Sequence, residues 1–383
     1  MTYLILLGLG ALDAAGYSII APVVPAIADE TGAGPGVMGA LVATFAVGMA
    51  IGFFLGGEGV RRRSSSAVLA ASLALMAGGS LGFIVWEGLP VYFGSRFAMG
   101  LGSGGLWIGV TFATLERFRG EEYRRLTGVL AVYSVGGIAG AGLGAIGGIR
   151  GPFAAYLVLV GAAAVGVAVL GTPAKRISFG SDRGALRSRA FALASAGILL
   201  VALALGTLEG PLPLHFAALL SQREVAALYV GTAIVVGASA AAAGRLPPRP
   251  TLAAATVLIV GGLALAGLTA SIPAWILASA IAALGFGLGE SAALGILLAA
   301  TGTERLVLAM VVWSQVWALG YLAGPAAGGA VAETLGFEAI GLVPLTAALL
   351  VATAFLFFTP ARSVTLPRTH PSPKGEREMG RYG

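Results

Sequence analysis

Residues 10–18 read GALDAAGYS and place an aspartate, Asp13, inside an apolar stretch that carries no other charge between Tyr3 and Ala28. Ten residues of helix advance about 15 Å, so Asp13 is predicted to lie near the middle of a hydrocarbon core about 30 Å thick. A carboxylate at that depth is costly unless a cavity, a partner or a proton stabilises it. The fold has to supply one of these three.

The composition is that of a protein with many membrane spans. The 383 residues are 57% hydrophobic and only 10% charged, and the mean hydropathy is +0.93. Sixty glycines would disfavour soluble helices, but small residues let membrane helices approach closely. The chain has no cysteine, which excludes disulfides and thiolate chemistry. The two histidines, His215 and His370, lie far apart in the sequence, so we expect no metal site and no cofactor.

Twelve apolar segments are long enough to cross a bilayer. They are predicted at 3–28, 37–57, 66–86, 89–114, 127–149, 152–172, 190–219, 226–244, 251–271, 273–300, 306–334 and 338–359. With a cytoplasmic N-terminus, all but three of the 23 basic residues fall in cytoplasmic loops or the tail, the exceptions being Arg96, Arg150 and Arg223. This asymmetry predicts an all-α protein of the inner (plasma) membrane with both termini in the cytoplasm.

The longest cytoplasmic connection divides these spans six and six. The predicted units are a first bundle at 1–172, a cytoplasmic linker at 173–189 and a second bundle at 190–360. A tail at 361–383 is polar and lacks apolar periodicity, so we expect it to be disordered.

The two predicted bundles also repeat in sequence. VYSVGGIAGAGLGAIGG, around Tyr133, aligns with VWSQVWALGYLAGPAAGG, around Trp313. The alignment places Gly140 over Gly320 and Gly144 over Gly324, which indicates duplication of a six-helix unit. We predict that these four glycines are close-packing points where leucine would block movement of the halves.

Twelve helices in two related halves resemble the major facilitator superfamily. LDAAGYSIIAPVVPAIADETG, residues 12–32, resembles the first helix of its drug:proton antiporter branch, in which an acidic residue precedes a P-x-x-P turn. RFAMGLGSGG, from Arg96, is similar to the family's fourth-helix motif, whose arginine is linked to proton transfer. GGIAGAGLGAIGG at 136–148 resembles the fifth-helix motif of antiporters. The resemblance implies alternating access, with the halves rocking about a midplane site.

Two segments depart from the family pattern. Ala145 stands where the fifth-helix motif usually has proline, and GGEGVRRRSSS is shorter than the usual G-x-x-x-D-[RK]-x-G-[RK]-[RK] loop. Glu58 is the only acid there that could act as the latch. The resemblance therefore implies a cytoplasmic gate formed by Glu58, Arg61 and Arg62.

Four ionisable residues fall within the predicted spans, namely Asp13, Arg96, Glu209 and Glu290. We interpret them as proton-coupling residues, because ionisable groups at membrane depth are usually functional; the alternative is an internal salt bridge that holds helices together. Three acids against one arginine leave carboxylates unpaired. Burial favours a protonated carboxyl group and a nearby cation favours the ionised form, so a proton and a cationic substrate would compete for such a site.

Aromatic residues accompany these acids. Tyr17 lies one turn from Asp13 and Phe286 one turn from Glu290, and aromatic rings attract organic cations. The alternative interpretation of each ring is helix packing. The predicted substrate-binding residues are Tyr17, Tyr133, Phe286, Glu290, Trp313 and Trp317.

The expected function is secondary active transport, namely proton-coupled efflux of small lipophilic or cationic compounds by alternating access, and not enzymatic catalysis. The alternatives are a metabolite importer or facilitator and a membrane receptor that does not transport. A sugar site would need more amide side chains than Gln222 and Gln315, and the chain has no asparagine. The expected partners are a small-molecule substrate, protons and the lipid bilayer, with no nucleic acid, and we expect a monomer.

Overall fold

The computed structural model describes residues 1–118, 121–171, 186, 188–301 and 306–358, and the description below concerns these ranges. The elements are α1 (Thr2–Ser18), η1 (Ala21–Val23), α2 (Val24–Thr31), α3 (Pro35–Arg62), α4 (Ser65–Val85), α5 (Leu89–Arg117), α6 (Glu122–Gly144), α7 (Arg150–Leu170), α8 (Arg189–Glu209), α9 (Leu212–Ala217), α10 (Gln222–Ala243), α11 (Pro248–Leu268), α12 (Ile272–Ala300), α13 (Leu306–Leu335), η3 (Phe337–Ala339) and α14 (Leu342–Phe358). They follow the twelve predicted spans in order, so the all-helical prediction is confirmed.

Ten helical segments of the described chain are long and apolar enough to cross a membrane. The helix α6, which has an apolar portion at Ala131–Gly144, and the 30-residue α13 complete the twelve. The predicted tail, and the predicted linker apart from residues 186, 188 and 189, lie outside the described residues.

The first span of each half is interrupted by proline. After α1 ends at Ser18, Pro22 and Pro25 are the second residues of η1 and α2. After α8 ends at Glu209, Pro211 directly precedes α9. Proline has no backbone N–H and its ring clashes with the preceding turn, so each helix breaks there. Such breaks are tolerated at membrane depth only where protein or a cavity surrounds the backbone.

The glycines predicted as close-packing points do pack closely, but within each half. A Cβ on Gly140 of α6 would lie 2.3 Å from the carbonyl oxygen of Ala15 on α1. A Cβ on Gly324 of α13 would lie 2.0 Å from the carbonyl oxygen of Leu203 on α8. Gly144 packs closely against Pro22 of η1, and Gly320 packs closely against α8. Their close packing is therefore confirmed, while the effect of leucine at these positions on movement of the halves stays a prediction. Helical spacing identifies a close-packing face but not its partner helix, so the sequence did not show that each contact lies within one half.

Replacing Gly324 should destabilise the second half directly. In Gly324→Ala the added methyl group would overlap a backbone carbonyl that cannot rotate away, and overpacking of this kind costs about 1–3 kcal/mol. We expect a lower melting temperature in detergent than for Gly261→Ala on α11, where nothing lies within 4 Å of the added Cβ. Equal melting temperatures for the two variants would contradict the close packing of α8 against α13.

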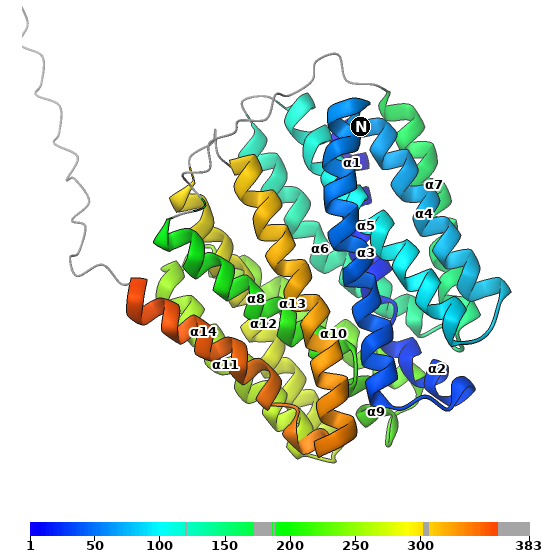
Figure 1. Ribbon diagram of the computed structural model, residues 1–383, viewed down its shortest axis with the longest axis vertical. Coiled ribbons are helices and arrows are strands. Elements are labelled where there is room, and N and C mark those ends of the chain that lie inside the picture. Colours follow the sequence, from blue (N-terminus) through cyan, green and yellow to red (C-terminus); the bar gives the residue numbers. More distant parts are fainter. Residues whose placement is uncertain (119–120, 172–185, 187, 302–305, 359–383) are drawn as a thin grey trace, which may run out of the picture.

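The two halves meet along α3 with α13 and along α6 with α10. We call the face where α3 and α5 end, with Arg61, Arg62 and Arg117 in their last turns, the basic face, and the other the opposite face. Figure 1 shows the halves diverging toward the basic face, where the N-terminus lies, while α2 and α9 lie close together at the opposite face. The molecule is therefore closed at the opposite face.

Candidate functional site

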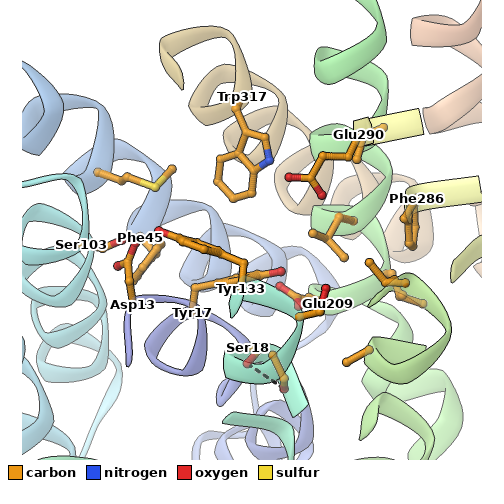
Figure 2. Close-up of a pocket in the computed structure, with 18 of the residues that line it drawn as sticks. Asp13, Tyr17, Ser18, Phe45, Ser103, Tyr133, Glu209, Phe286, Glu290 and Trp317 are labelled. Carbon is orange, nitrogen blue, oxygen red and sulfur yellow. Dashed lines mark hydrogen bonds between the residues drawn. The ribbon is translucent and has the colours of Figure 1, made fainter. Parts of the chain in front are cut away.

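A cavity lies between the two halves (Figure 2). Four helices of each half line it: α1, α3, α5 and α6 from the first, and α8, α10, α12 and α13 from the second. Its wall is mostly apolar and aromatic, and its charged residues are Asp13, Glu209 and Glu290. No basic residue of the described chain lines it. All six predicted substrate-binding residues are part of the wall, namely Tyr17, Tyr133, Phe286, Glu290, Trp313 and Trp317.

Asp13 lies on the first half's side of the cavity. Its side chain is 5% exposed, and its Oδ2 accepts a hydrogen bond from the Tyr133 hydroxyl of α6. Its Oδ1 is buried without a hydrogen-bond partner, and Ser103 of α5 lies beside it in Figure 2. A buried carboxylate oxygen with no donor is costly as an anion, and a proton on the carboxyl group removes much of that cost. This arrangement suits a group that binds and releases a proton.

Asp13 is also linked to the second half. The Tyr133 ring packs edge-on against Trp107 of α5, with ring centroids 5.4 Å apart. The Trp107 indole N–H donates a 3.2 Å hydrogen bond to Ser314 Oγ on α13. A change in the charge of Asp13 that moves Tyr133 would therefore also affect the hydrogen bond between Trp107 and Ser314, which joins the two halves.

Glu209 is the last residue of α8 and sits beside the proline break. It is 3% exposed, and its Oε2 accepts a 2.5 Å hydrogen bond from the Tyr321 hydroxyl of α13. The Tyr321 ring stacks on Trp317 at 5.1 Å and packs edge-on against Tyr17 of the first half at 5.6 Å. Glu209 is thus held by an aromatic cluster that both halves share.

Glu290 differs from the other two acids because no side chain or backbone group of the described chain hydrogen-bonds to it. In Figure 2 its carboxylate points into the cavity toward Trp317, from the same helix, α12, that carries Phe286. An unpaired carboxylate facing aromatic rings is a suitable binding group for an organic cation, because charge attraction and cation–π attraction add.

Arg96 lies behind the cavity wall and not on it. The side chain is fully buried on α5, and its Nη1 donates a 3.2 Å hydrogen bond to the Gly16 carbonyl of α1. Its guanidinium carbon lies 4.4 Å from the ring centre of Phe45, which does line the cavity. Nε and Nη2 have no hydrogen-bond partner. The arginine does not neutralise any of the three carboxylates by direct contact.

The residues predicted to form a cytoplasmic gate lie at the end of α3, away from the cavity. Glu58 pairs with both Arg61, at 2.5 Å, and Arg62 of its own helix. Both arginine side chains are exposed. Within the described chain Glu58 forms no hydrogen bond or ion pair with the second half, so the gate stays a prediction for a state in which the basic face is closed.

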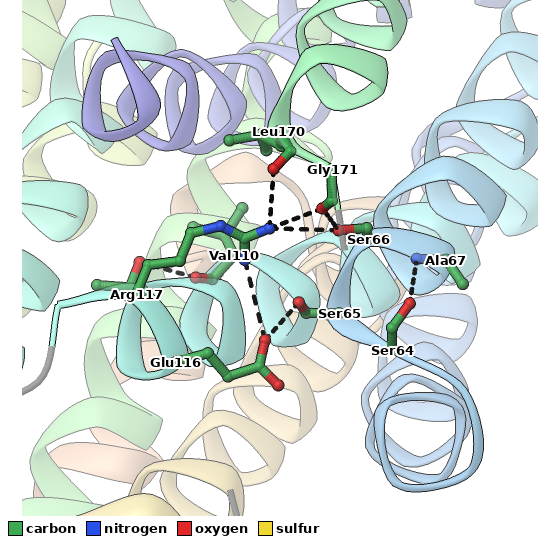
Figure 3. A network of polar contacts seen from close by, with 10 residues as sticks. Ser64, Ser65, Ser66, Ala67, Val110, Glu116, Arg117, Leu170 and Gly171 are labelled. Atoms are coloured by element: carbon green, nitrogen blue, oxygen red, sulfur yellow. Dashed lines mark hydrogen bonds and ion pairs between the residues drawn. The ribbon is translucent and has the colours of Figure 1, made fainter. Parts of the chain in front are cut away.

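A separate polar network joins three helices of the first half at the basic face (Figure 3). Arg117 at the end of α5 donates to the Gly171 carbonyl at 2.8 Å and to Leu170, at the end of α7, at 3.3 Å. The neighbouring Glu116 accepts a 2.6 Å hydrogen bond from Ser65, the first residue of α4. This network fixes the ends of α4, α5 and α7 relative to one another.

Several residues of the cavity or next to it were not predicted from the sequence. Ser103, Thr232 and Ser314 are small polar residues in helices rich in alanine and glycine, and they line the cavity only because of how their helices are rotated. Trp107 follows the motif that begins at Arg96, and that proximity was the one available clue. Tyr321 shares a helical face with Trp313 and Trp317, but its hydrogen bond to Glu209 depends on how α13 packs against α8.

Comparison with known proteins identifies the family. The sequence profile described as Major Facilitator Superfamily matches residues 6–246. No curated sequence matched the chain. A solved structure of a bacterial homolog to the human lysosomal transporter Spinster, inward-facing and unoccupied, is 12% identical with a TM-score of 0.70, covering 93% of this chain and 95% of that one.

The occupied, inward-facing form of that homolog is 14% identical with a TM-score of 0.72, over 93% of this chain and 95% of that one. A D-xylose-proton symporter is 13% identical with a TM-score of 0.72, over 91% of this chain and 96% of that one. Identities this low establish a shared fold and nothing about the substrate. Because the matched profile covers more than half of the chain, this protein belongs to the Major Facilitator Superfamily and is a membrane transporter, not an enzyme.

Proposed function

We propose that the protein is a proton-coupled exporter of small lipophilic cations and of neutral compounds of similar shape. The observation that carries the proposal is the cavity itself, an aromatic and apolar space between the halves that contains three carboxylates and, within the described chain, no basic residue. Such a wall attracts a lipophilic cation and repels an anion. The described lining contains no asparagine or glutamine, whose amide groups we expect at a sugar site.

The three carboxylates support a division of roles. Asp13 and Glu209 are almost fully buried and each accepts a tyrosine hydroxyl, so they suit proton binding. Glu290 faces the cavity without a partner and suits the substrate cation. Because the sites share one low-polarity space, a cation that enters favours release of a proton, and a proton that enters favours release of the cation. Reciprocal competition of this kind produces exchange.

The orientation of the chain is compatible with export. We place the basic face in the cytoplasm, since basic residues gather on that side of membrane proteins. The cavity then opens inward, and the closed opposite face is external. In this state the transporter would collect its substrate from the cytoplasm, and rocking of the halves would release it outside while protons enter.

Substrate-induced proton release from the purified protein tests this function. In weakly buffered detergent solution with a pH indicator, tetraphenylphosphonium or ethidium should release protons, whereas xylose and lactate at the same concentration should not. The control is Asp29→Asn, which replaces an exposed acid at the end of α2 and should leave the release unchanged. Proton uptake or release by xylose with no response to the cations would overturn the proposal and favour a metabolite symporter.

A further inference from the structure

We propose that Gln222 and Glu333 hold the opposite face closed by capping the ends of two helices that belong to the other half, and so set the side to which the cavity opens. Both residues lie on the second half, at the opposite-face ends of α10 and α13. Within the described chain, the hydrogen-bond partners of these two side chains are all backbone groups of the first half. The inference needs only a transporter with two moving halves, and does not depend on the proposed substrate or on protons.

Glu333 completes the start of α3. The first backbone N–H groups of a helix have no partner within the helix, and a side chain at the N-cap usually supplies one. The N-cap of α3 is Gly34, which has no side chain to do so. Glu333 Oε2 instead accepts a 2.9 Å hydrogen bond from the Gly36 N–H. Its negative charge also lies at the end of the helix where the helix dipole favours an anion.

Glycine at position 36 leaves the space that the Glu333 carboxylate occupies. A Cβ at this position would lie 1.9 Å from Glu333 Oε2, so any larger residue would displace the carboxylate. One turn further along α3, Gly39 meets α13 directly, since its Cβ would lie 2.1 Å from the Pro325 carbonyl oxygen. The carboxylate cap therefore lies at the edge of a close backbone-to-backbone contact between the halves.

Gln222 completes the end of α6. The last carbonyl groups of a helix also lack partners. The Gln222 side chain donates from Nε2 to the Gly144 and Gly148 carbonyls, each at 3.0 Å, and its Oε1 accepts from the Gly148 N–H at 2.9 Å. Gly147 and Gly148 have φ of +93° and +64°, so the turn that presents these groups needs glycine. One amide thus satisfies three backbone groups of the other half.

These contacts have the properties of a reversible latch. They act at two different interfaces, α3 with α13 and α6 with α10, so together they close two sides of the same face. Glu333 is exposed, and the Gly36 and Gly148 contacts lie at the surface. When the halves separate there, water can replace the lost hydrogen bonds, which keeps the cost of opening modest. A buried cap would be much harder to release.

Distances between spin labels on the two halves test the latch, and the absence of cysteine allows labels to be introduced without a background. Trp86 and Leu219 are exposed at the opposite face, one in each half, and Leu4 and Leu246 are the corresponding pair at the basic face. Each pair is replaced by cysteines, labelled, and measured in nanodiscs without substrate or a pH gradient.

In the double variant Gln222→Ala/Glu333→Ala we expect the ratio of long to short distances at the opposite face to rise at least about tenfold, the equivalent of about 1.4 kcal/mol. The distances at the basic face should shorten. Gly36→Ala, made on the other half, should reproduce the effect of Glu333→Ala alone. Arg223→Ala and Glu338→Ala, which change neighbouring exposed residues, are the controls and should match the parent protein.

Two results would overturn the inference. The first is an unchanged opposite-face distribution in the double variant. The second is a broader distance distribution at both faces together with a lower melting temperature. A residue that only stabilises the fold would loosen both faces, whereas loss of a latch opens the opposite face and closes the basic face. Failure of any substrate to release protons bears on the proposed function and leaves this measurement unaffected.

Discussion

Proteoliposomes that contain Asp13→Asn are expected to show no substrate accumulation in response to a pH gradient, while exchange of substrate across the membrane without a gradient continues. Asparagine keeps the size of the side chain and can still accept the Tyr133 hydroxyl, so the wall of the cavity is preserved. It cannot bind or release a proton. Since Asp13 Oδ1 is buried with no hydrogen-bond partner, the ionised state in the parent protein is costly and the proton is its natural compensation.

The matched control for this measurement is Asp29→Asn, the same chemical change at an exposed position on α2. Tyr133→Phe removes the hydrogen bond to Asp13 but keeps the ring against Trp107, so it should alter the pH dependence of transport and retain uphill transport. Full uphill transport by Asp13→Asn would show that this carboxylate does not couple the cycle. Glu209, the other buried acid with a tyrosine partner, would then be the candidate.

Glu290→Gln is expected to weaken the binding of lipophilic cations by about tenfold or more, about 1.4 kcal/mol, with little change for neutral compounds of similar shape. The amide keeps the size and polarity of the side chain and loses its charge. Since no described residue pairs with Glu290, removing the charge leaves no partner stranded, and the loss reports the attraction to the cation alone.

Binding can be followed through tryptophan fluorescence, because Trp107, Trp313 and Trp317 all line the cavity. In the parent protein, cation affinity should fall as the pH is lowered, since protons then compete for the carboxylates. In Glu290→Gln that dependence should be weaker. Glu338→Gln, an exposed position on η3, is the control. An equal loss for cationic and neutral compounds would indicate that Glu290 shapes the cavity and does not recognise charge.

Much of the fold could be predicted from the sequence because the bilayer imposes simple rules. The length of each apolar stretch predicts a span, and the distribution of arginine predicts which face is cytoplasmic. The observed helices follow the predicted spans, as α10 at Gln222–Ala243 follows the prediction of 226–244. Asp13, Glu209 and Glu290 could be singled out because charge at membrane depth has to face protein or a cavity.

The sequence alone therefore determined the number of spans, the acidic residues of the cavity and the aromatic character of its wall, since each depends on which residue types lie at which depth. Tertiary structure alone decided which groups meet. The glycines at 140 and 324 pack within a half, Arg96 lies behind Phe45, Tyr321 bonds Glu209, and Gln222 and Glu333 reach across to backbone groups. Helical periodicity assigns a residue to a face of its own helix, but the rotation and tilt of the neighbouring helix determine what that face contacts.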